Sequence, residues 1–332
     1  MTSYIIRRTL YMIPTLILIT LICFTILYIP PGDFLTSYKR ALVNQEGMNR
    51  TQALKLVERL REKYNLDAPF FVQYYGWIKN IVLHGNFGQS FDYREPVTKV
   101  IMGRLGMTFA IAFTTLVFTW LVAIPVGIYS ATHQYGIGDY TFTLLAFVGI
   151  SIPNFFFALV MMFVMVFFFN SSAVGGLFSP EFLGQPWSWP KFVDMLKHVW
   201  IVIIVIGTAG MAGTMRVMRG NLLDVLQQQY VQTARSKGLR EWNVVYKHAV
   251  RNAIQPLIMR LGMLLPRLIQ GAVVTGIVLN LPTAGPLFYR AISNQDMYLA
   301  ATFLLMMAVL LLVGNLVADI LLALIDPRIR YE

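Results

Sequence analysis

Residues 9–32 read TLYMIPTLILITLICFTILYIPPG, a run of 24 residues without a charged side chain. A helix needs about 20 mostly apolar residues to cross the roughly 30 Å hydrocarbon core of a bilayer. The run therefore predicts a transmembrane helix, and it starts directly after Arg7 and Arg8. It lacks a small-residue cleavage site at its end, so we interpret it as an uncleaved anchor and not as a secretory signal.

Similar charge-free windows recur along the rest of the chain. They cover residues 105–138, 140–180, 198–215 and 297–318, and a further window at 268–289 has Arg267 immediately before it. Trimmed to the thickness of a membrane, the windows predict an all-α membrane protein with six transmembrane helices, near residues 9–30, 106–131, 140–169, 198–217, 256–281 and 298–324.

The composition of the 332-residue chain argues against a soluble fold, because 57% of its residues are hydrophobic and only 13% are charged. A typical soluble domain has about 25% charged residues. The net charge of +11 would suit a nucleic-acid-binding protein, but the basic residues occupy loops between apolar windows, as in membrane proteins. We therefore expect a lipid bilayer, and not nucleic acid, around this chain.

The distribution of basic residues also predicts an orientation. Arg7, Arg8 and the basic segment 216–251 are expected in the cytoplasm by the positive-inside rule. Six spans then place both termini in the cytoplasm and segment 31–104 outside the cell membrane. That segment is basic, but loops longer than about 60 residues escape the rule.

The chain divides into three regions on these grounds. Within the external segment, apolar residues at helical spacing predict an amphipathic helix over 53–64 and a short helix near 69–83. The expected regions are an N-terminal segment with the first helix (1–30), an extracytoplasmic loop region with amphipathic helices (31–104), and a five-helix core with a cytoplasmic loop at 220–255 (105–332).

The sequence offers no pattern for catalysis or for a bound cofactor. It contains no Gly-Lys pair, so a Walker phosphate loop is excluded. It also has no His-Glu-x-x-His zinc motif, and its four histidines are scattered. We expect no catalytic residue, no metal and no cofactor on this chain.

The basic segment 220–255 is longer than a simple helix connection requires. It predicts two short helices broken at Gly238, a typical C-cap glycine, with Trp242 and other apolar residues between basic ones. One interpretation is a basic helix on the lipid surface. We favour a docking surface for a soluble partner.

At this segment the sequence resembles the loop with which ABC-importer permeases engage their ATPases. The family pattern Glu-Ala-Ala-x-x-x-Gly matches Gln232-Thr233-Ala234 and Gly238, with Gln232 in place of glutamate. The fuller form, Thr-Ala-Arg-x-Lys-Gly-Leu followed by His-Ala-x-Arg-Asn-Ala-x-x-Pro, is similar to the oligopeptide/dipeptide branch. Further matches to the B-type subunit of that branch are Pro31-Gly32-Asp33, Leu66-Asp67-Ala68-Pro69, Gly85-Asn86-Phe87-Gly88 and Asp326-Pro327-Arg328.

The resemblance implies a type I ABC importer permease with six transmembrane helices and an extracytoplasmic insertion between the first two. Its expected partners are a second homologous permease chain, two cytoplasmic ATPases that hold ATP and Mg, and an extracytoplasmic solute-binding protein. The insertion is expected to lie under the binding protein or against the partner permease. Contact with the ATPases is expected from a coupling helix over 230–246, through Gln232, Thr233, Ala234, Arg235, Lys237, Gly238, Leu239, Arg240, Glu241 and Trp242.

Several residues are candidates for the translocation path. Ser151, Pro153 and Asn154 are expected at a break in the third span, where a proline kink without other function is the alternative. Arg267 would lie about 16 Å into the fifth span, near mid-bilayer. The resemblance implies that this span, which also carries Thr275, lines the path. Arg267 would then contact the substrate, or form a structural ion pair with Asp319.

The resemblance leaves the cargo open. Peptides are the commonest cargo of this branch, but oligosaccharides and other small solutes are carried by relatives. Gly276 and residues 281–286 depart from the family pattern around the fifth span, where they bear on the substrate class. An ion-coupled secondary carrier is a further alternative, but it would predict inverted repeats and acidic residues at mid-membrane, which the sequence does not display.

Overall fold

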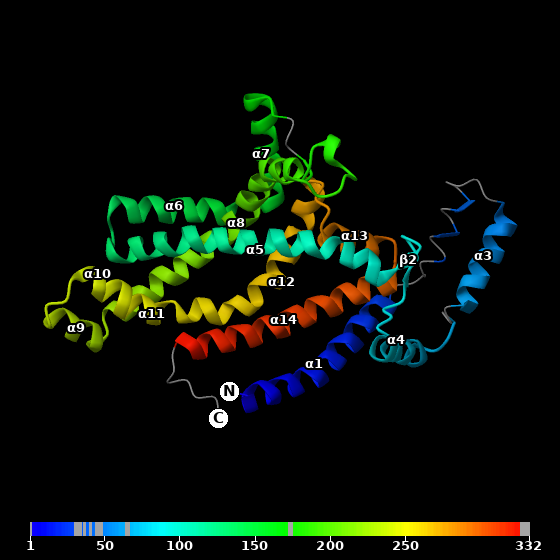
Figure 1. Ribbon diagram of the computed structural model, residues 1–332, viewed down its shortest axis with the longest axis horizontal. Helices are drawn as coiled ribbons and strands as arrows, with labels where there is room; N and C mark the ends of the chain where they lie inside the picture. Colours follow the sequence, from blue (N-terminus) through cyan, green and yellow to red (C-terminus); the bar gives the residue numbers. More distant parts are fainter. Residues whose placement is uncertain are drawn as a thin grey trace. The chain divides into compact units, whose positions relative to one another are not determined.

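The computed structural model describes residues 2–29, 35, 38–39, 42–43, 49–63, 67–171 and 175–325, and within these the side chains of residues 2–5, 265, 267, 268, 270–272 and 325 are not described. The described chain is almost entirely helical (Figure 1). Its helices are α1 (Thr2–Tyr28), α3 (Arg50–Lys63), α4 (Phe70–His84), α5 (Val97–Thr132), α6 (Ile137–Ser151), α7 (Asn154–Phe169), α8 (Trp189–Leu226), α9 (Gln229–Ser236), α10 (Glu241–Asn243), α11 (Val250–Ala253), α12 (Gln255–Val278), α13 (Ala284–Ser293) and α14 (Met297–Ile325).

The described chain also contains several short elements. Two-residue strands β1 (Gln89–Ser90) and β2 (Glu95–Pro96) pair in antiparallel register. A 3-10 turn covers Pro180–Phe182, and a π-helical turn covers Val244–Ala249. The amphipathic helix expected at 53–64 corresponds to α3, whose residues are described up to Lys63, and the helix expected near 69–83 corresponds to α4.

Four helices in the described part of the chain are long and apolar enough to cross a membrane: α1, α5, α8 and α14. They match the expected first, second, fourth and sixth spans. The helix α12 covers the expected fifth span, although it does not meet the same length and hydropathy test over the described residues. Both α5 and α8 extend well beyond the predicted spans, because charged residues end a hydrophobic window without ending a helix.

The expected third span is not one straight helix. It is divided into α6 and α7, which together are apolar enough to span a membrane but meet at an angle of 102°. Figure 1 shows α7 turning away from the line of α6. The break falls at Ile152 and Pro153, where proline disfavours helical geometry in the residue before it and cannot donate a backbone hydrogen bond. The break expected at this position is therefore confirmed.

The chain forms two compact units, and the first consists of residues 1–5, 107–282 and 310–332. In this unit α8 contacts α6, α7, α11 and α12. A close helix crossing brings α12 to α14: a Cβ atom built on Gly262 would lie only 2.5 Å from the backbone nitrogen of Asn315. Glycine at this position therefore allows an approach that any side chain would prevent.

The second unit consists of residues 6–106 and 283–309. It contains α13, a ten-residue helix that lies beyond the expected fifth span and was not predicted from the sequence. Asp296 is fully buried in this unit, where its carboxylate accepts a 2.5 Å hydrogen bond from the Ser90 hydroxyl and a 3.2 Å bond from the Asp92 backbone N–H. Burial raises the pKa of Asp296 despite these donors.

Candidate functional site

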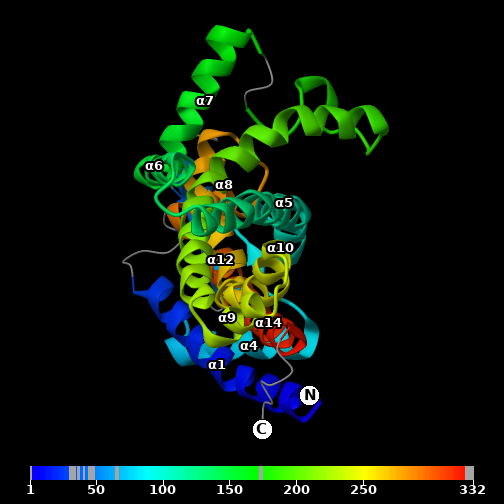
Figure 2. The ribbon, with the colours of Figure 1, turned by 90° about the vertical axis from the view of Figure 1, so that its left-hand side faces the viewer.

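The segment from Gln229 to Ala253, called here the 229–253 segment, follows α8 and consists of α9, α10, the π-helical turn and α11. Figure 2 shows α9 and α10 together at the end of the first unit that faces the viewer. The inner face of the segment is anchored in a hydrophobic cluster with α5, α8 and α12, whose buried members are Ile128, Ala131, Met218, Leu222, Val231, Ala234, Val244, Val245, Ala249, Ala253 and Leu257.

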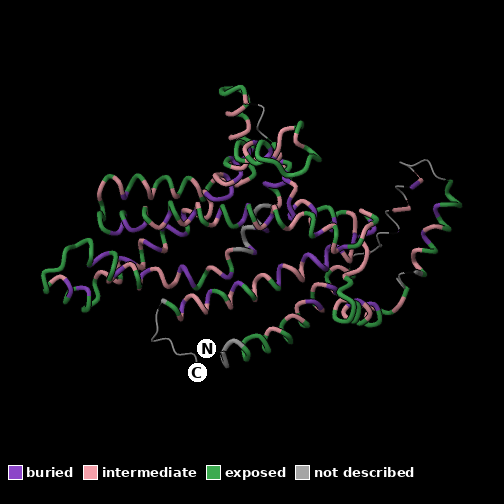
Figure 3. The backbone as a smooth tube through the Cα atoms, viewed as in Figure 1, coloured by how far each residue is buried: buried purple, intermediate pink, exposed green. Residues whose placement is uncertain are grey.

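The periodicity of α9 explains this anchoring. Val231 and Ala234 are three residues apart and lie on one helical face, and both are buried, while Gln232 and Thr233 between them are exposed. Figure 3 shows this alternation of buried and exposed residues along the segment. The hydrophobic contacts therefore hold a short helix that would not be stable alone.

The helix α9 ends at a glycine-dependent turn. Gly238 has a positive φ of 74°, and its N–H donates to the Arg235 carbonyl at 2.9 Å, while the Leu239 N–H donates to the Ala234 carbonyl at 3.4 Å. This pair of bonds defines a Schellman motif. The predicted break at Gly238 is confirmed, but the expected single coupling helix over 230–246 is wrong, because α9 ends at Ser236 and helical structure resumes only at Glu241.

An ion pair bridges this turn. The Arg235 guanidinium donates to both carboxylate oxygens of Glu241, at 2.7 Å from Nη2 and 3.2 Å from Nε. The hydrogen bonds from Arg235 lower the pKa of Glu241, and those to Glu241 raise the pKa of Arg235. The two side chains therefore bridge the turn, and Arg235 is engaged within its own chain.

The remaining predicted coupling residues divide into two groups. Gln232 and Thr233 bind nearby backbone: the Gln232 amide donates to the carbonyl of Leu226, the last residue of α8, at 3.1 Å, and the Thr233 hydroxyl donates to the Gln229 carbonyl at 2.8 Å. Lys237, Leu239, Arg240 and Trp242 are exposed. The second group is thus presented on the surface, as a docking role requires.

Trp242 is part of an exposed aromatic pair that the sequence did not indicate. Its side chain is 67% exposed, and its ring centroid lies 3.8 Å from that of Tyr246. The i,i+4 spacing of two aromatic residues was the available signal. A second missed contact is the 2.6 Å hydrogen bond from the Asn252 amide to the Tyr230 hydroxyl, which ties α11 to α9. Exposed, rigidly held aromatic residues are typical of binding hot spots.

The predicted translocation-path residues are only partly described. Ser151, Pro153 and Asn154 lie at the break between α6 and α7, and the Ser151 hydroxyl donates to the Phe147 carbonyl at 2.8 Å. Thr275 is buried, and its hydroxyl has no hydrogen-bond partner among the described residues. The Arg267 side chain lies outside the described residues, so its pairing with Asp319 stays a prediction.

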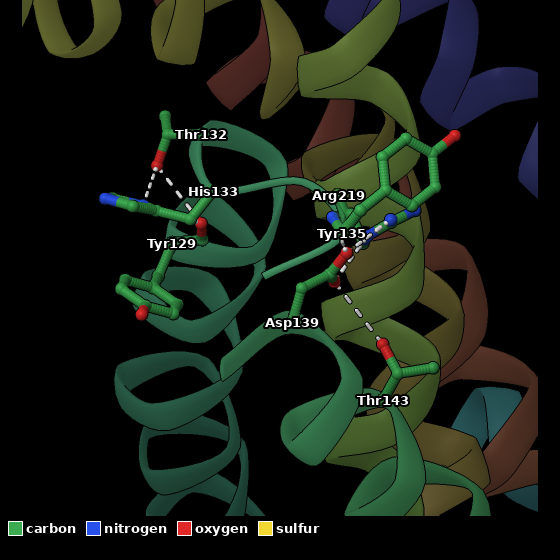
Figure 4. A network of polar contacts seen from close by, with 7 residues as sticks. All are labelled: Tyr129, Thr132, His133, Tyr135, Asp139, Thr143 and Arg219. Atoms are coloured by element: carbon green, nitrogen blue, oxygen red, sulfur yellow. Dashed lines mark hydrogen bonds and ion pairs between the residues drawn. The ribbon is translucent and has the colours of Figure 1, made fainter. Parts of the chain in front are cut away.

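A largely buried ion pair between α6 and α8 was also missed. Figure 4 shows Arg219 of α8 reaching Asp139 of α6, with nitrogen–oxygen distances of 2.9 and 2.7 Å. The same carboxylate accepts a 3.1 Å bond from the Tyr135 backbone N–H. The signal was Asp139 itself, the lone acid between two charge-free windows, but no local pattern indicates a partner 80 positions away.

The membrane-length helices and the broken span define a multi-pass α-helical membrane protein, and its anchored 229–253 segment presents an exposed aromatic and basic surface. In the described residues no cluster of three or more His, Cys, Asp or Glu side chains is placed to hold a metal. The family model described as binding-protein-dependent transport system inner membrane component matches residues 123–331, and the model for the N-terminal part of such membrane components matches residues 1–112.

The chain belongs to this family. It is similar along its whole length to curated relatives: it is 37% identical over 332 residues to the oligopeptide transport system permease protein AppB of Bacillus subtilis, with 100% of both chains covered. It is 30% identical over 347 residues to the dipeptide transport system permease protein DppB of Escherichia coli, again with 100% of both chains covered. The chain is therefore a multi-pass inner-membrane permease subunit of an ABC importer with the type I fold, as its sequence predicted.

Proposed function

We propose that this chain forms half of the translocation pore of an ATP-driven peptide importer. Support for a peptide cargo comes from the relatives, which are named as oligopeptide and dipeptide permeases and are similar over their full lengths. A second homologous permease supplies the other half of the pore. Two cytoplasmic ATPases hold ATP and Mg, and an extracytoplasmic binding protein delivers the peptide.

The observation that carries this proposal is the 229–253 segment, with its buried anchor and its exposed outer face. Trp242 and Leu239 offer apolar area to an ATPase groove, and the exposed cations Lys237 and Arg240 offer charge-assisted contacts. Since the segment packs directly on α8 and α11 leads into α12, a movement of the ATPases would be transmitted to the helices of the bundle. This is how hydrolysis would be coupled to opening of the pore.

The proposal includes an orientation. With both termini in the cytoplasm, the 229–253 segment faces the ATPases, and region 31–104 faces the binding protein or the partner permease. The break at Ser151, Pro153 and Asn154 then lies on the translocation path. Two features of the sequence support this orientation. The 229–253 segment is rich in Lys and Arg, and the stretch 170–197 on the opposite side contains few of them.

The test is to purify the complex, reconstitute it in lipid, and compare Trp242→Ala with the wild type. We expect the variant to retain its fold but to lose ATPase association by about tenfold or more, since a buried interface tryptophan is typically a hot spot. Trp189→Ala is the matched control, because Trp189 is similarly exposed, at 75% against 67% for Trp242, but begins α8 at its opposite end. Co-purification of the ATPases at the wild-type level with Trp242→Ala would contradict the docking role.

The cargo is tested in the same vesicles by measuring ATP hydrolysis and uptake with a binding protein loaded with peptide or with oligosaccharide. Stimulation by the peptide-loaded form supports the proposal. Stimulation by the oligosaccharide-loaded form alone would overturn the peptide cargo and keep the importer. Uptake driven by an ion gradient without ATP would overturn the importer itself.

A further inference from the structure

The first unit contains a cavity of about 600 Å³ between α5, α7, α8 and α12. This volume lies within the usual range of small-molecule sites, roughly 300–1,000 Å³. The lining residues are Trp120, Asn154, Ile206, Ala209, Gly210, Gly213, Thr214, Leu257, Arg260, Met263 and Leu264. One of them, Asn154, is the residue at which α7 begins after the break in the third span.

One wall of the cavity exists because α8 has small residues there. Ala209, Gly210 and Gly213 lie within one helical turn of each other and all line the cavity. A Cβ atom added to Gly213 would meet no other atom within 4 Å. A larger side chain at Gly213 would therefore enter the cavity, whereas a Cβ atom added to Gly210 would already lie 3.4 Å from the Thr119 side chain.

The polar lining of the cavity combines donors with two groups that also accept, since Asn154 has an amide oxygen and the Thr214 hydroxyl, which donates to the Gly210 carbonyl at 2.9 Å, keeps its lone pairs. Arg260 carries the positive charge, it is exposed, and it has no ion-pair or hydrogen-bond partner among the described residues. The Asn154 amide likewise has no partner in the described part of the chain. The indole N–H of Trp120 is buried and unpaired there as well. No acidic side chain is among the described residues that line the cavity.

Because Arg260 is the one charged residue in the described lining, the cavity favours an anionic ligand. Arg260 lies about 8 Å along α12 from its first residue, at 1.5 Å per residue, next to the apolar side chains of Leu257, Met263 and Leu264. A guanidinium in such surroundings gains from a counter-charge, and it matches a carboxylate with two parallel hydrogen bonds. A single cation beside apolar walls suits one carboxylate joined to an apolar body.

We propose that this cavity binds the C-terminal carboxylate of a peptide through Arg260, while the Asn154 amide donates to a peptide carbonyl. The apolar wall formed by Leu257, Met263 and Leu264 then contacts the last side chains of the peptide. The inference rests on the proposed peptide import and adds to it a site on this permease that discriminates free from blocked C-termini.

The test uses the complete complex of permeases and ATPases in nanodiscs, without the binding protein, so that the specificity of that protein does not enter. The probes are two tripeptides with a benzophenone side chain at the second position, one with a free C-terminal carboxylate and one with a C-terminal amide. After irradiation, labelled residues are mapped by mass spectrometry. We expect the acid to label Met263 and its neighbours about tenfold more than the amide does, as expected for a charge-assisted pair.

Variants sharpen this result. Arg260→Gln lowers labelling by the acid to the level of the amide, and Arg260→Lys retains part of the difference because it keeps the charge. Gly213→Leu fills the cavity and reduces labelling by both probes. Gly220→Leu is the matched control, because Gly220 is also in α8, also has no atom within 4 Å of an added Cβ, and does not line the cavity.

The outcomes separate this inference from the function on which it rests. Equal labelling by acid and amide in the wild type, or unchanged acid labelling in Arg260→Gln, overturns the carboxylate site, while peptide uptake by the same importer keeps the proposed function. Absence of peptide uptake with every loaded binding protein overturns the proposed function, and the peptide site is then overturned with it. Size-exclusion profiles identify a variant that has failed to assemble. If Arg260→Gln fails to assemble, the difference between acid and amide labelling in Arg260→Lys tests the carboxylate site in its place.

Discussion

The first unit contains two arginine–carboxylate pairs with nearly the same geometry and very different surroundings. Arg219 binds Asp139 between α8 and α6 with distances of 2.7 and 2.9 Å. Arg235 binds Glu241 across the Gly238 turn with distances of 2.7 and 3.2 Å. The carboxylate side chain is 4% exposed in the first pair and 60% exposed in the second.

Because the two pairs have similar hydrogen-bond geometry, the difference that we expect between their contributions to stability comes from burial. Removing one partner of a buried pair leaves an uncompensated charge away from water, which is strongly destabilising. An exposed pair competes with water and with counter-ions and contributes little to stability. We therefore interpret the Asp139–Arg219 pair as a structural connection between helices and the Arg235–Glu241 pair as a means of shaping a docking surface.

The largest expected effect is that of Asp139→Asn. The substitution removes the countercharge of Arg219, and we expect the free energy of unfolding to fall by about 3 kcal/mol. This is near the lower end for a broken buried pair, because Arg219 keeps 27% of its side chain exposed. The measurement is the midpoint of thermal unfolding of the purified complex in detergent. A shift no larger than that of an exposed surface substitution would remove the contrast between the two pairs.

Two controls belong to this prediction. Thr143→Val removes only a 3.5 Å contact to Asp139 and is expected to change the midpoint far less. The double variant Asp139→Asn with Arg219→Gln removes both charges, and it is expected to recover part of the loss, because no uncompensated charge remains.

The next effect concerns the turn that brings Arg235 and Glu241 together. Gly238→Ala places a Cβ atom in a left-handed conformation with φ at 74°, which costs roughly 1–2 kcal/mol. Gly220→Ala is the matched substitution in the interior of α8, where the added atom meets nothing within 4 Å. There alanine is expected to stabilise the helix by about 0.5–1 kcal/mol. We expect Gly238→Ala to lower the midpoint of thermal unfolding and Gly220→Ala to raise it. A lower midpoint in both variants would contradict this prediction.

Hydropathy predicted most of the fold because lipid exposure leaves long apolar runs in the sequence. The expected spans near 9–30 and 298–324 correspond closely to α1 and α14. The ends of α5 and α8 were missed, since polar helical turns outside the membrane carry no such signal. The break before Asn154 was predicted from Pro153, but the 102° angle depends on contacts of α7 with α8 and α12 that no local pattern records.

The candidate site was predictable where it depends on local chemistry. Gly238 was identified as a helix terminator because its conformational freedom is an intrinsic property. The Arg235–Glu241 bridge was not foreseen, although both residues were named, because its formation requires the turn to bring the two side chains together. Arg260 was missed altogether, because the cavity that it lines is built by helices far apart in the sequence.

The smallest expected effect is the pH dependence of the exposed pair. Arg235 lowers the pKa of Glu241 below its ordinary value, so the folded protein favours the ionised carboxylate. The stabilisation is therefore fully present above the ordinary glutamate pKa, roughly pH 4, and is lost as the pH falls through the lower pKa of the folded state. At neutral pH this stabilisation amounts to less than about 1 kcal/mol, since both side chains are solvated.

Glu241→Gln removes the titrating group, so we expect its thermal midpoint to lie slightly below that of the wild type at pH 7 and to converge with it in acid. Arg235→Gln should behave alike, because it removes the cation that lowers the pKa. Midpoints that diverge as the pH falls would mean that Glu241 is stabilised in its protonated form, and the interpretation of this pair as an exposed, water-screened bridge would then be wrong.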